Sequence, residues 1–270
     1  MNKMHYTVMV VLDKEEKEHI VSSVEKRLAP FSAHTEVEGY ISVTVEDIAQ
    51  KQQMLQVTLK EEKEKIKAQE LNPVEGALVV ALGKDLGIEE MKPKMSDNFY
   101  IQNEALIMSD TVLEFAKGWY GEECLDEEGN VVSTYNPKAQ WDWYVIGGRW
   151  SGLLQHINGK EIDYGQKKVI NWHAMNQKAL REAEKAWKEI KASDQIPIQY
   201  LFSGYKQGMS RKEFIDMQSA FSTYAVLTKK GEWIEKEMDG NEKDWDTNFK
   251  NRFLDAVDEE DIIVIVDCHM

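Results

Sequence analysis

The sequence predicts a single α+β domain over residues 1–270, in which helices cover an antiparallel, ferredoxin-like sheet and a helical elaboration occupies about 45–110. Strand-like apolar runs lie at both ends and in the middle of the chain, so one sheet must gather distant segments. Amphipathic segments separate these runs, and no linker, repeat or low-complexity tract divides the chain. A hydrophobic content of 42% is ample for the core of such a domain.

The first two elements have clear patterns. Met4–Leu12 is apolar on both alternating faces, as in an interior strand, and Asp13 ends it. The charged stretch that follows predicts a helix, because its apolar residues recur at helical spacing: Ile20, Val21, Val24 and Leu28.

A long helix is predicted from Thr44 to about Leu71. Its apolar stripe is narrow, with intervals of seven, four and seven residues between Ile48, Leu55, Leu59 and Ile66. Such a stripe is closer to a coiled-coil seam than to a core-facing helix. Two interpretations follow. The helix lies across the sheet, or it is an arm that pairs with a second subunit in a homodimer.

The segment that follows this helix has no clear periodicity. Residues 72–105 are ambiguous, and 77–82 fits a strand or a buried helix. Asp110 or Thr111, with Glu114, opens a short helix that ends at Gly121. The aromatic segment 136–150 comes next, followed by a hairpin over 152–164 that turns at Asn158-Gly159 and a helix over 171–191. A further helix begins at the Ser210 capping box, and a second hairpin covers 224–236. The chain closes with a helix from Trp245, which has apolar residues every four positions, and a strand over 262–266.

Composition excludes several classes of protein. A formal net charge of −15 opposes binding to duplex DNA or RNA or to an anionic membrane, because each requires a basic face. No apolar run approaches the ~18 residues of a transmembrane helix, and the N-terminus lacks a signal-peptide pattern. Two cysteines, Cys124 and Cys268, make neither a disulfide framework nor a zinc site. We therefore expect a reducing cytoplasm, no metal and no cofactor.

The aromatic segment carries the strongest candidate site. Its members are three of the eight tryptophans, a tyrosine, two glycines and an arginine: Trp141, Trp143, Tyr144, Gly147, Gly148, Arg149 and Trp150. Aromatic faces can stack on a base, and backbone N–H groups beside a guanidinium can hold an anion. We predict that these residues bind a small anionic, nucleotide-like ligand. The alternative is a bulged corner whose aromatic rings fill the core and whose arginine pairs with an internal carboxylate.

Strand alternation limits this prediction. In an extended segment, Trp141 and Trp143 point to one side, and Asp142 and Tyr144 point to the other. We therefore expect at most one of these pairs to face a ligand, while the other pair packs inward.

The last strand ends in Asp267-Cys268-His269, a weaker candidate for acid–base catalysis. Alternation places Asp267 and His269 on one face, and His5 joins them if the first and last strands are neighbours. The alternative is a structural histidine, hydrogen-bonded at the end of a sheet. The chain has no P-loop, dinucleotide-binding or nucleophile-elbow motif that would indicate a standard enzyme class.

Four segments resemble a family of uncharacterised proteins from tailed phages and prophages. The central one, Asn136–Gly152, has the pattern Asn-Pro-x-x-x-Trp-Asp-Trp-Tyr-x-x-Gly-Gly-Arg-Trp-Ser-Gly. The other three are His5–Val8, Leu28–Phe31 with Thr35–Val37, and Ile265–His269. The resemblance implies a phage accessory protein made in the bacterial cytoplasm. Such proteins often counter host immunity, and several sequester nucleotide signals.

Together these observations predict a phage counter-defence protein that binds and sequesters a small nucleotide-derived host immune signal without turning it over. The first alternative is a hydrolase of the same ligand class, with His5, Asp267 and His269 as acid–base residues. The second is a protein-binding module that docks a host defence protein through its aromatic cluster.

Overall fold

The computed structural model describes residues 5–71, 98–192, 205, 208–236 and 242–270, so the ambiguous run 77–82 lies outside the described residues. The contacts divide the chain into two compact units, Met1–Glu36 with Tyr135–Met270, and Val37–Thr134. The predicted α+β class is confirmed. The segment predicted as an elaboration around 45–110 belongs to the second unit, which also includes a strand pair of its own.

The first unit is built on a six-stranded sheet. Its strands in spatial order are β4 (Trp143–Ile146), β10 (Ile262–His269), β1 (Tyr6–Leu12), β8 (Ala225–Leu227) and β9 (Trp233–Glu235), and β7 (Tyr164–Gln166) also pairs with β10. Each pair is antiparallel except β1 with β8, so the sheet is mixed and a ferredoxin-like order is not confirmed. The turn at Gly231 predicted the pairing of β8 with β9. A turn between two strands does not indicate which strand pairs with β8 on its other side, so the parallel pairing with β1 was not predicted.

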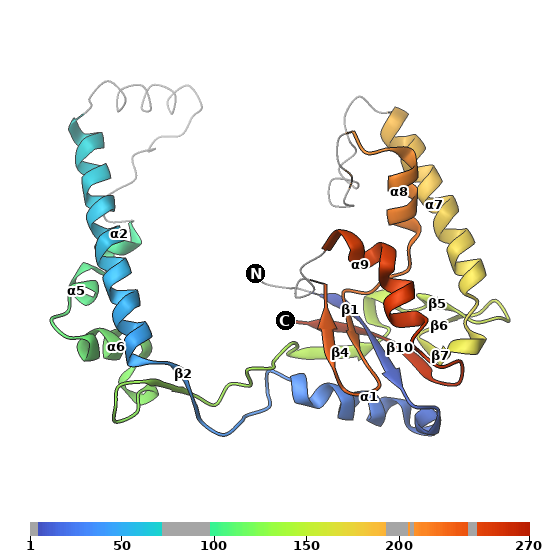
Figure 1. Ribbon diagram of the computed structural model, residues 1–270, viewed down its shortest axis with the longest axis horizontal. Helices are drawn as coiled ribbons and strands as arrows, with labels where there is room; N and C mark the ends of the chain where they lie inside the picture. Colours follow the sequence, from blue (N-terminus) through green and yellow to red (C-terminus); the bar gives the residue numbers. More distant parts are fainter. Residues whose placement is uncertain (1–4, 72–97, 193–204, 206–207, 237–241) are drawn as a thin grey trace. The chain divides into compact units, whose positions relative to one another are not determined.

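Alternation of the central strands gives this sheet two buried faces. The even-numbered residues of β1 and β10 pack with α1 (Ile20–Leu28). The odd-numbered residues pack with α9 (Glu242–Phe249), with the π-helical turn η8 (Lys250–Leu254) and with the start of α7 (Trp172–Ala192). Figure 1 shows α1 and α9 along opposite faces of the sheet. Both faces of the central strands are therefore covered, as their continuous apolar pattern predicted.

The shorter elements of the first unit follow the predicted turn and capping signals. Gly159 closes the hairpin of β5 (Leu154–Gln155) and β6 (Glu161–Ile162). Ser210 with Glu213 forms the capping box of the helix α8 (Arg211–Ser219). The remaining short elements are η1 (Lys14–His19), η2 (Ala29–Phe31), η5 (Gly148–Trp150) and η6 (Lys167–Val169).

The second unit has its own core around the long helix. Its elements are β2 (Tyr40–Val43), α2 (Val45–Leu71), α4 (Phe99–Gln102), α5 (Glu104–Ile107), α6 (Val112–Tyr120), η4 (Glu122–Cys124) and β3 (Val131–Ser133). Ile48, Leu55 and Leu59 of α2 are buried in one cluster with Ile107 and Phe115. Three of the four stripe residues are thus covered within their own unit, whereas Ile66 is only partly buried and lies outside this cluster. The hypothesis that this helix is an arm that pairs with a second subunit in a homodimer stays a prediction. In the part of the chain that the structure describes, no helix is both long and apolar enough to cross a membrane.

Lys229 forms ion pairs with carboxylates at the ends of both central strands. Nζ of Lys229 lies 2.7 Å from Oδ2 of Asp13, which follows β1, and 2.9 Å from Oδ1 of Asp261, which precedes β10. The hydrogen bond from Lys229 holds the pKa of the Asp13 carboxyl below its usual value. The contact between Lys229 and Asp13 is therefore weakened when this carboxyl is protonated at low pH.

We expect Lys229→Met to lower stability at neutral pH and this loss to shrink in acid. Because the pKa of Asp13 is lower in the folded than in the unfolded chain, its contribution is present above the unfolded value of about 4 and is lost as pH falls through the folded pKa. Urea unfolding at neutral pH and at about pH 3 measures the difference. Lys230→Met, one residue on and also exposed, is the matched control. A loss that does not change with pH would contradict the pH dependence expected from Asp13.

Candidate functional site

The first and last strands are neighbours, as the prediction for His5 required. In the antiparallel register of β1 and β10, Thr7 lies opposite Asp267 and Tyr6 lies opposite Cys268. Nδ1 of His5 lies 2.8 Å from Oδ1 of Asp267. The structure therefore joins two of the three weaker candidates in a hydrogen-bonded pair.

A second histidine–aspartate pair lies beside the first. Strand β4 flanks β10 with Trp143 opposite His269, and Nδ1 of His269 lies 2.7 Å from Oδ1 of Asp142. The backbone N–H of Asp142 also donates to the carbonyl oxygen of His269 at 2.9 Å. The ring centroids of His5 and His269 are 5.1 Å apart, with an interplanar angle of 69°. Two imidazoles, each held by a carboxylate, thus meet at one end of the sheet.

The two pairs differ in burial. Asp267 is 1% exposed, whereas the side chain of Asp142 is 41% exposed. The second oxygen of Asp267, Oδ2, accepts the backbone N–H of Arg149 at 3.0 Å, so both oxygens of this buried carboxylate have donors. The histidine side chains, 20% exposed at His5 and 38% at His269, face solvent in part. In the described residues neither Nε2 has a protein partner among the hydrogen bonds.

The two glycines are required by close approach to carboxylates. Gly147 and Gly148 have φ of +73° and +55°. A Cβ on Gly148 would lie 2.5 Å from Cβ of Asp267, and one on Gly147 would lie 2.5 Å from Oδ2 of Asp163. Asp163 in turn accepts the backbone N–H of Gly152 at 2.6 Å. The loop after β4 therefore packs closely against the buried carboxylate of Asp267 and the partly buried carboxylate of Asp163.

The guanidinium of Arg149 does not pair with an internal carboxylate of the described residues, although the alternative of a structural corner assumed that it does. The backbone N–H of Arg149, and not its guanidinium, bonds the internal carboxylate of Asp267. The residue is exposed, and its guanidinium is in none of the ion pairs of the described residues. The side chain is therefore available to an external anion.

The aromatic residues divide between the core and the surface. Trp141 and Tyr144 contact each other at a centroid distance of 4.9 Å on the α1 side, and Nε1 of Trp141 donates to the carbonyl oxygen of Leu28 at 3.0 Å. Trp150 packs on the opposite core. Trp143 is 49% exposed, and its ring lies 5.8 Å from that of His5. Of the predicted stacking rings, Trp143 is the one that the fold leaves at the surface beside the histidines.

The predicted alternation of this segment was wrong for Trp141 and Asp142, because the segment is not extended throughout. Trp141 and Trp143 lie on opposite sides of the sheet, because the chain bends at Asp142 before β4 begins. The same bend brings the carboxylate of Asp142 to His269. Sequence reasoning missed Asp142 as a site residue for this reason, although it lies in the middle of the aromatic motif.

The cysteine between Asp267 and His269 has no part in the site. Cys268 is fully buried on the α1 side of the sheet. Burial raises the pKa of its thiol far above the usual value, so it carries no thiolate near neutral pH. Cys268 is therefore a core residue and not a nucleophile.

No protein-family model, curated protein or solved structure matches this chain. Among the described residues, no group of three or more His, Cys, Asp or Glu side chains has the arrangement of a metal site.

Proposed function

We propose that this protein cleaves a phosphoester bond of a small nucleotide-like molecule by general acid–base catalysis, with His5 and His269 as the catalytic pair. The observation that carries the proposal is two imidazoles 5.1 Å apart, each held at Nδ1 by a carboxylate. A carboxylate at Nδ1 fixes the ring orientation and stabilises the imidazolium that forms when Nε2 takes a proton. Asp267 and Asp142 are the positioning residues.

The pair can supply both proton transfers of a hydrolysis. One imidazole takes a proton from water at Nε2 while the water oxygen forms its bond to phosphorus. The other, protonated at Nε2, gives its proton to the leaving oxygen as the bond between that oxygen and phosphorus breaks. One water is consumed, and a phosphate monoester and an alcohol are released. Proton exchange with solvent then restores the starting forms of the two rings.

Two neighbouring residues support a planar, anionic substrate. Trp143 offers an exposed aromatic face beside His5, and base stacking on such a face contributes ~1–3 kcal/mol. Arg149 offers a guanidinium that no described carboxylate neutralises. In a chain of net charge −15, the attraction for a phosphate must come from such a local cation.

The direct test is product formation from candidate substrates. The purified protein is incubated with cyclic dinucleotides, cyclic ADP-ribose isomers, ADP-ribose and NAD, and the mixtures are analysed by mass spectrometry. With the wild-type protein, we expect a product that has gained one water at a phosphoester bond, with a new phosphate monoester and a new hydroxyl. We expect no such product with a variant that carries both His5→Ala and His269→Ala. Full recovery of every compound after incubation with the wild-type protein would contradict the proposal.

For the substrate that is cleaved, we expect Trp143→Ala to raise KM by roughly 5- to 150-fold with a smaller change in kcat, because stacking is lost from the bound substrate. Trp143→Phe keeps part of the aromatic face and should recover part of the affinity. Tyr164→Ala, which removes another exposed ring from the same sheet, is the matched control. Steady-state kinetics separate the two constants. A fall in kcat at unchanged KM would contradict a stacking role.

Sequestration without turnover is the second candidate function. The availability of Arg149 favours it, because an exposed guanidinium binds anions but does no acid–base chemistry. The resemblance to phage accessory proteins gives the same candidate, with a host immune signal as the bound molecule. Calorimetry with the same compounds distinguishes the two functions. Sequestration predicts a stoichiometric heat of binding that Arg149→Ala abolishes and Arg149→Lys partly restores, with the ligand recovered intact.

A further inference from the structure

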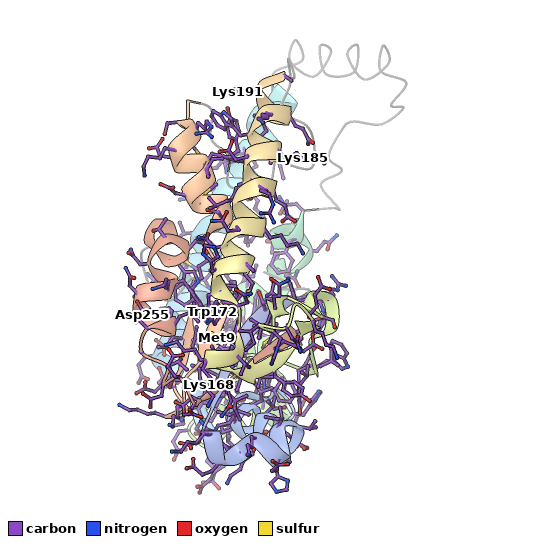
Figure 2. The ribbon with its side chains drawn as sticks, turned by 90° about the vertical axis from the view of Figure 1, so that its right-hand side faces the viewer. Met9, Lys168, Trp172, Lys185, Lys191 and Asp255 are labelled. Atoms are coloured by element: carbon purple, nitrogen blue, oxygen red, sulfur yellow. The ribbon has the colours of Figure 1, made fainter. Side chains whose placement is uncertain are left out.

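A cavity of about 680 Å³ lies in the first unit, on the side of the sheet covered by α9. It is bounded by the start of α7, by the end of η8 and by the β5–β6 hairpin. Figure 2 labels two of its lining residues, Trp172 at the base of α7 and Asp255 next to η8. None of its lining residues belongs to the histidine site. Its volume is within the roughly 300–1,000 Å³ of pockets that hold small molecules.

The inner wall of the cavity is apolar and aromatic. It includes Leu153, Trp172, Met175, Phe221 and Leu254, each of which also packs on the core beneath. The rings of Trp172 and Phe221 contact edge to face, with centroids 5.3 Å apart. Thioether and aromatic side chains adapt well to apolar ligands. Such a wall is suited to a molecule that itself contains an aromatic ring.

Two ion pairs join charged side chains that line the cavity. Lys250 lies 2.9 Å from Asp255, and Lys178 lies 3.7 Å from Glu161. Asp246 accepts from Lys236 at 2.7 Å and from the hydroxyl of Ser222. These pairs are solvent-exposed and weak, but each charge already has a partner of opposite sign, so an ionic ligand gains little from them and an uncharged ligand needs none. The lining therefore favours an uncharged occupant.

The ring of Trp172 has packing contacts but no hydrogen bond within the part of the chain that the structure describes. Its Nε1 is shielded from solvent and has no hydrogen-bond acceptor among the described residues. Buried indole N–H groups normally have an acceptor. Without a hydrogen bond, the position of the indole ring depends on the groups that contact it. Part of the ring borders the cavity, where no group of the described residues contacts it. An occupant would complete the packing around this ring.

We propose that this cavity is a binding site for a small, uncharged, largely apolar molecule that contains an aromatic ring. The volume of the cavity limits the size of the ligand, and its apolar, aromatic wall favours a ligand of the same character. The ion pairs at its edge favour an uncharged molecule. This site is separate from the histidine pair and would bind a molecule that the acid–base chemistry does not act on.

The test compares two fluorescent probes that differ in one charged group. N-phenyl-1-naphthylamine is uncharged, and 1-anilinonaphthalene-8-sulfonate is the same framework with a sulfonate. We expect the full-length protein to bind one equivalent of the uncharged probe, with at least about tenfold higher affinity than the sulfonate. Equal affinities, or no saturable binding of the uncharged probe, would overturn the proposal.

A variant that fills the cavity locates the binding. Ala179 of α7 lines the cavity, so Ala179→Trp should weaken binding of the uncharged probe by at least about tenfold. Gln177→Trp adds the same side chain at an exposed position of the same helix that does not line the cavity, and it should bind like the wild type. If circular dichroism shows Ala179→Trp to be unfolded, Ala179→Leu replaces it, with a smaller loss expected. Unchanged affinity in a folded Ala179 variant would overturn the proposal.

Discussion

Replacing either His5 or His269 by alanine is expected to lower kcat for phosphoester cleavage by about 10²–10⁴-fold, the usual contribution of a general acid or base. Each ring supplies one proton transfer, and the other ring cannot perform both. His5→Ala also removes a hydrogen-bond donor from the buried carboxylate of Asp267, so we expect it to lower stability more than His269→Ala, whose partner Asp142 is 41% exposed.

His19→Ala is the control for this experiment, because His19 is exposed on η1 and lies outside the site. Circular dichroism and urea unfolding establish that the variants are folded. Losses at His5 and His269 no larger than the loss at His19 would contradict their catalytic role.

Gly148→Ala is expected to lower the free energy of unfolding by about 2–5 kcal/mol. Positive φ at an L-residue costs about 1–2 kcal/mol, and overpacking against Asp267, 2.5 Å from the new Cβ, adds about 1–3 kcal/mol. The clash also displaces the carboxylate that holds His5, so activity should fall together with stability.

Gly159→Ala is the matched control for Gly148. Gly159 has φ of +86°, and a Cβ there would meet nothing within 4 Å. Its substitution carries the backbone cost alone, about 1–2 kcal/mol. Urea unfolding of the two variants measures the difference. An equal cost at the two glycines would show that Asp267 does not require the close approach of Gly148.

Local signals in the sequence predicted the elements that depend on neighbouring residues. The capping boxes at Thr111 and Ser210 and the turn at Asn158-Gly159 depend on a few adjacent side chains, and the structure contains all three. The continuous apolar runs of β1 and β10 predicted buried interior strands, and both lie in the centre of the sheet. Such signals need no knowledge of the distant chain.

The features that the sequence did not predict depend on distant partners or on a single bend. The stripe of α2 predicted a seam, and Ile48, Leu55 and Leu59 are buried, but the pattern did not identify the helices that cover them. The parallel pairing of β1 with β8 joins segments more than 200 residues apart, with no turn to fix their direction. At the site, periodicity placed Asp267 and His269 correctly on one face but misplaced Asp142, because one bent residue changes the direction of every side chain around it.

The most direct test of the histidine pair is the dependence of each variant on the leaving group. The rates of His5→Ala and His269→Ala are compared on a dinucleoside phosphodiester, whose leaving alcohol needs a proton, and on bis(p-nitrophenyl) phosphate, whose leaving phenolate does not. If one histidine is the general acid and the other the general base, one variant regains most of the wild-type rate on the nitrophenyl ester and the other does not. Equal losses for both variants on both substrates would contradict the assignment of an acid and a base to this pair.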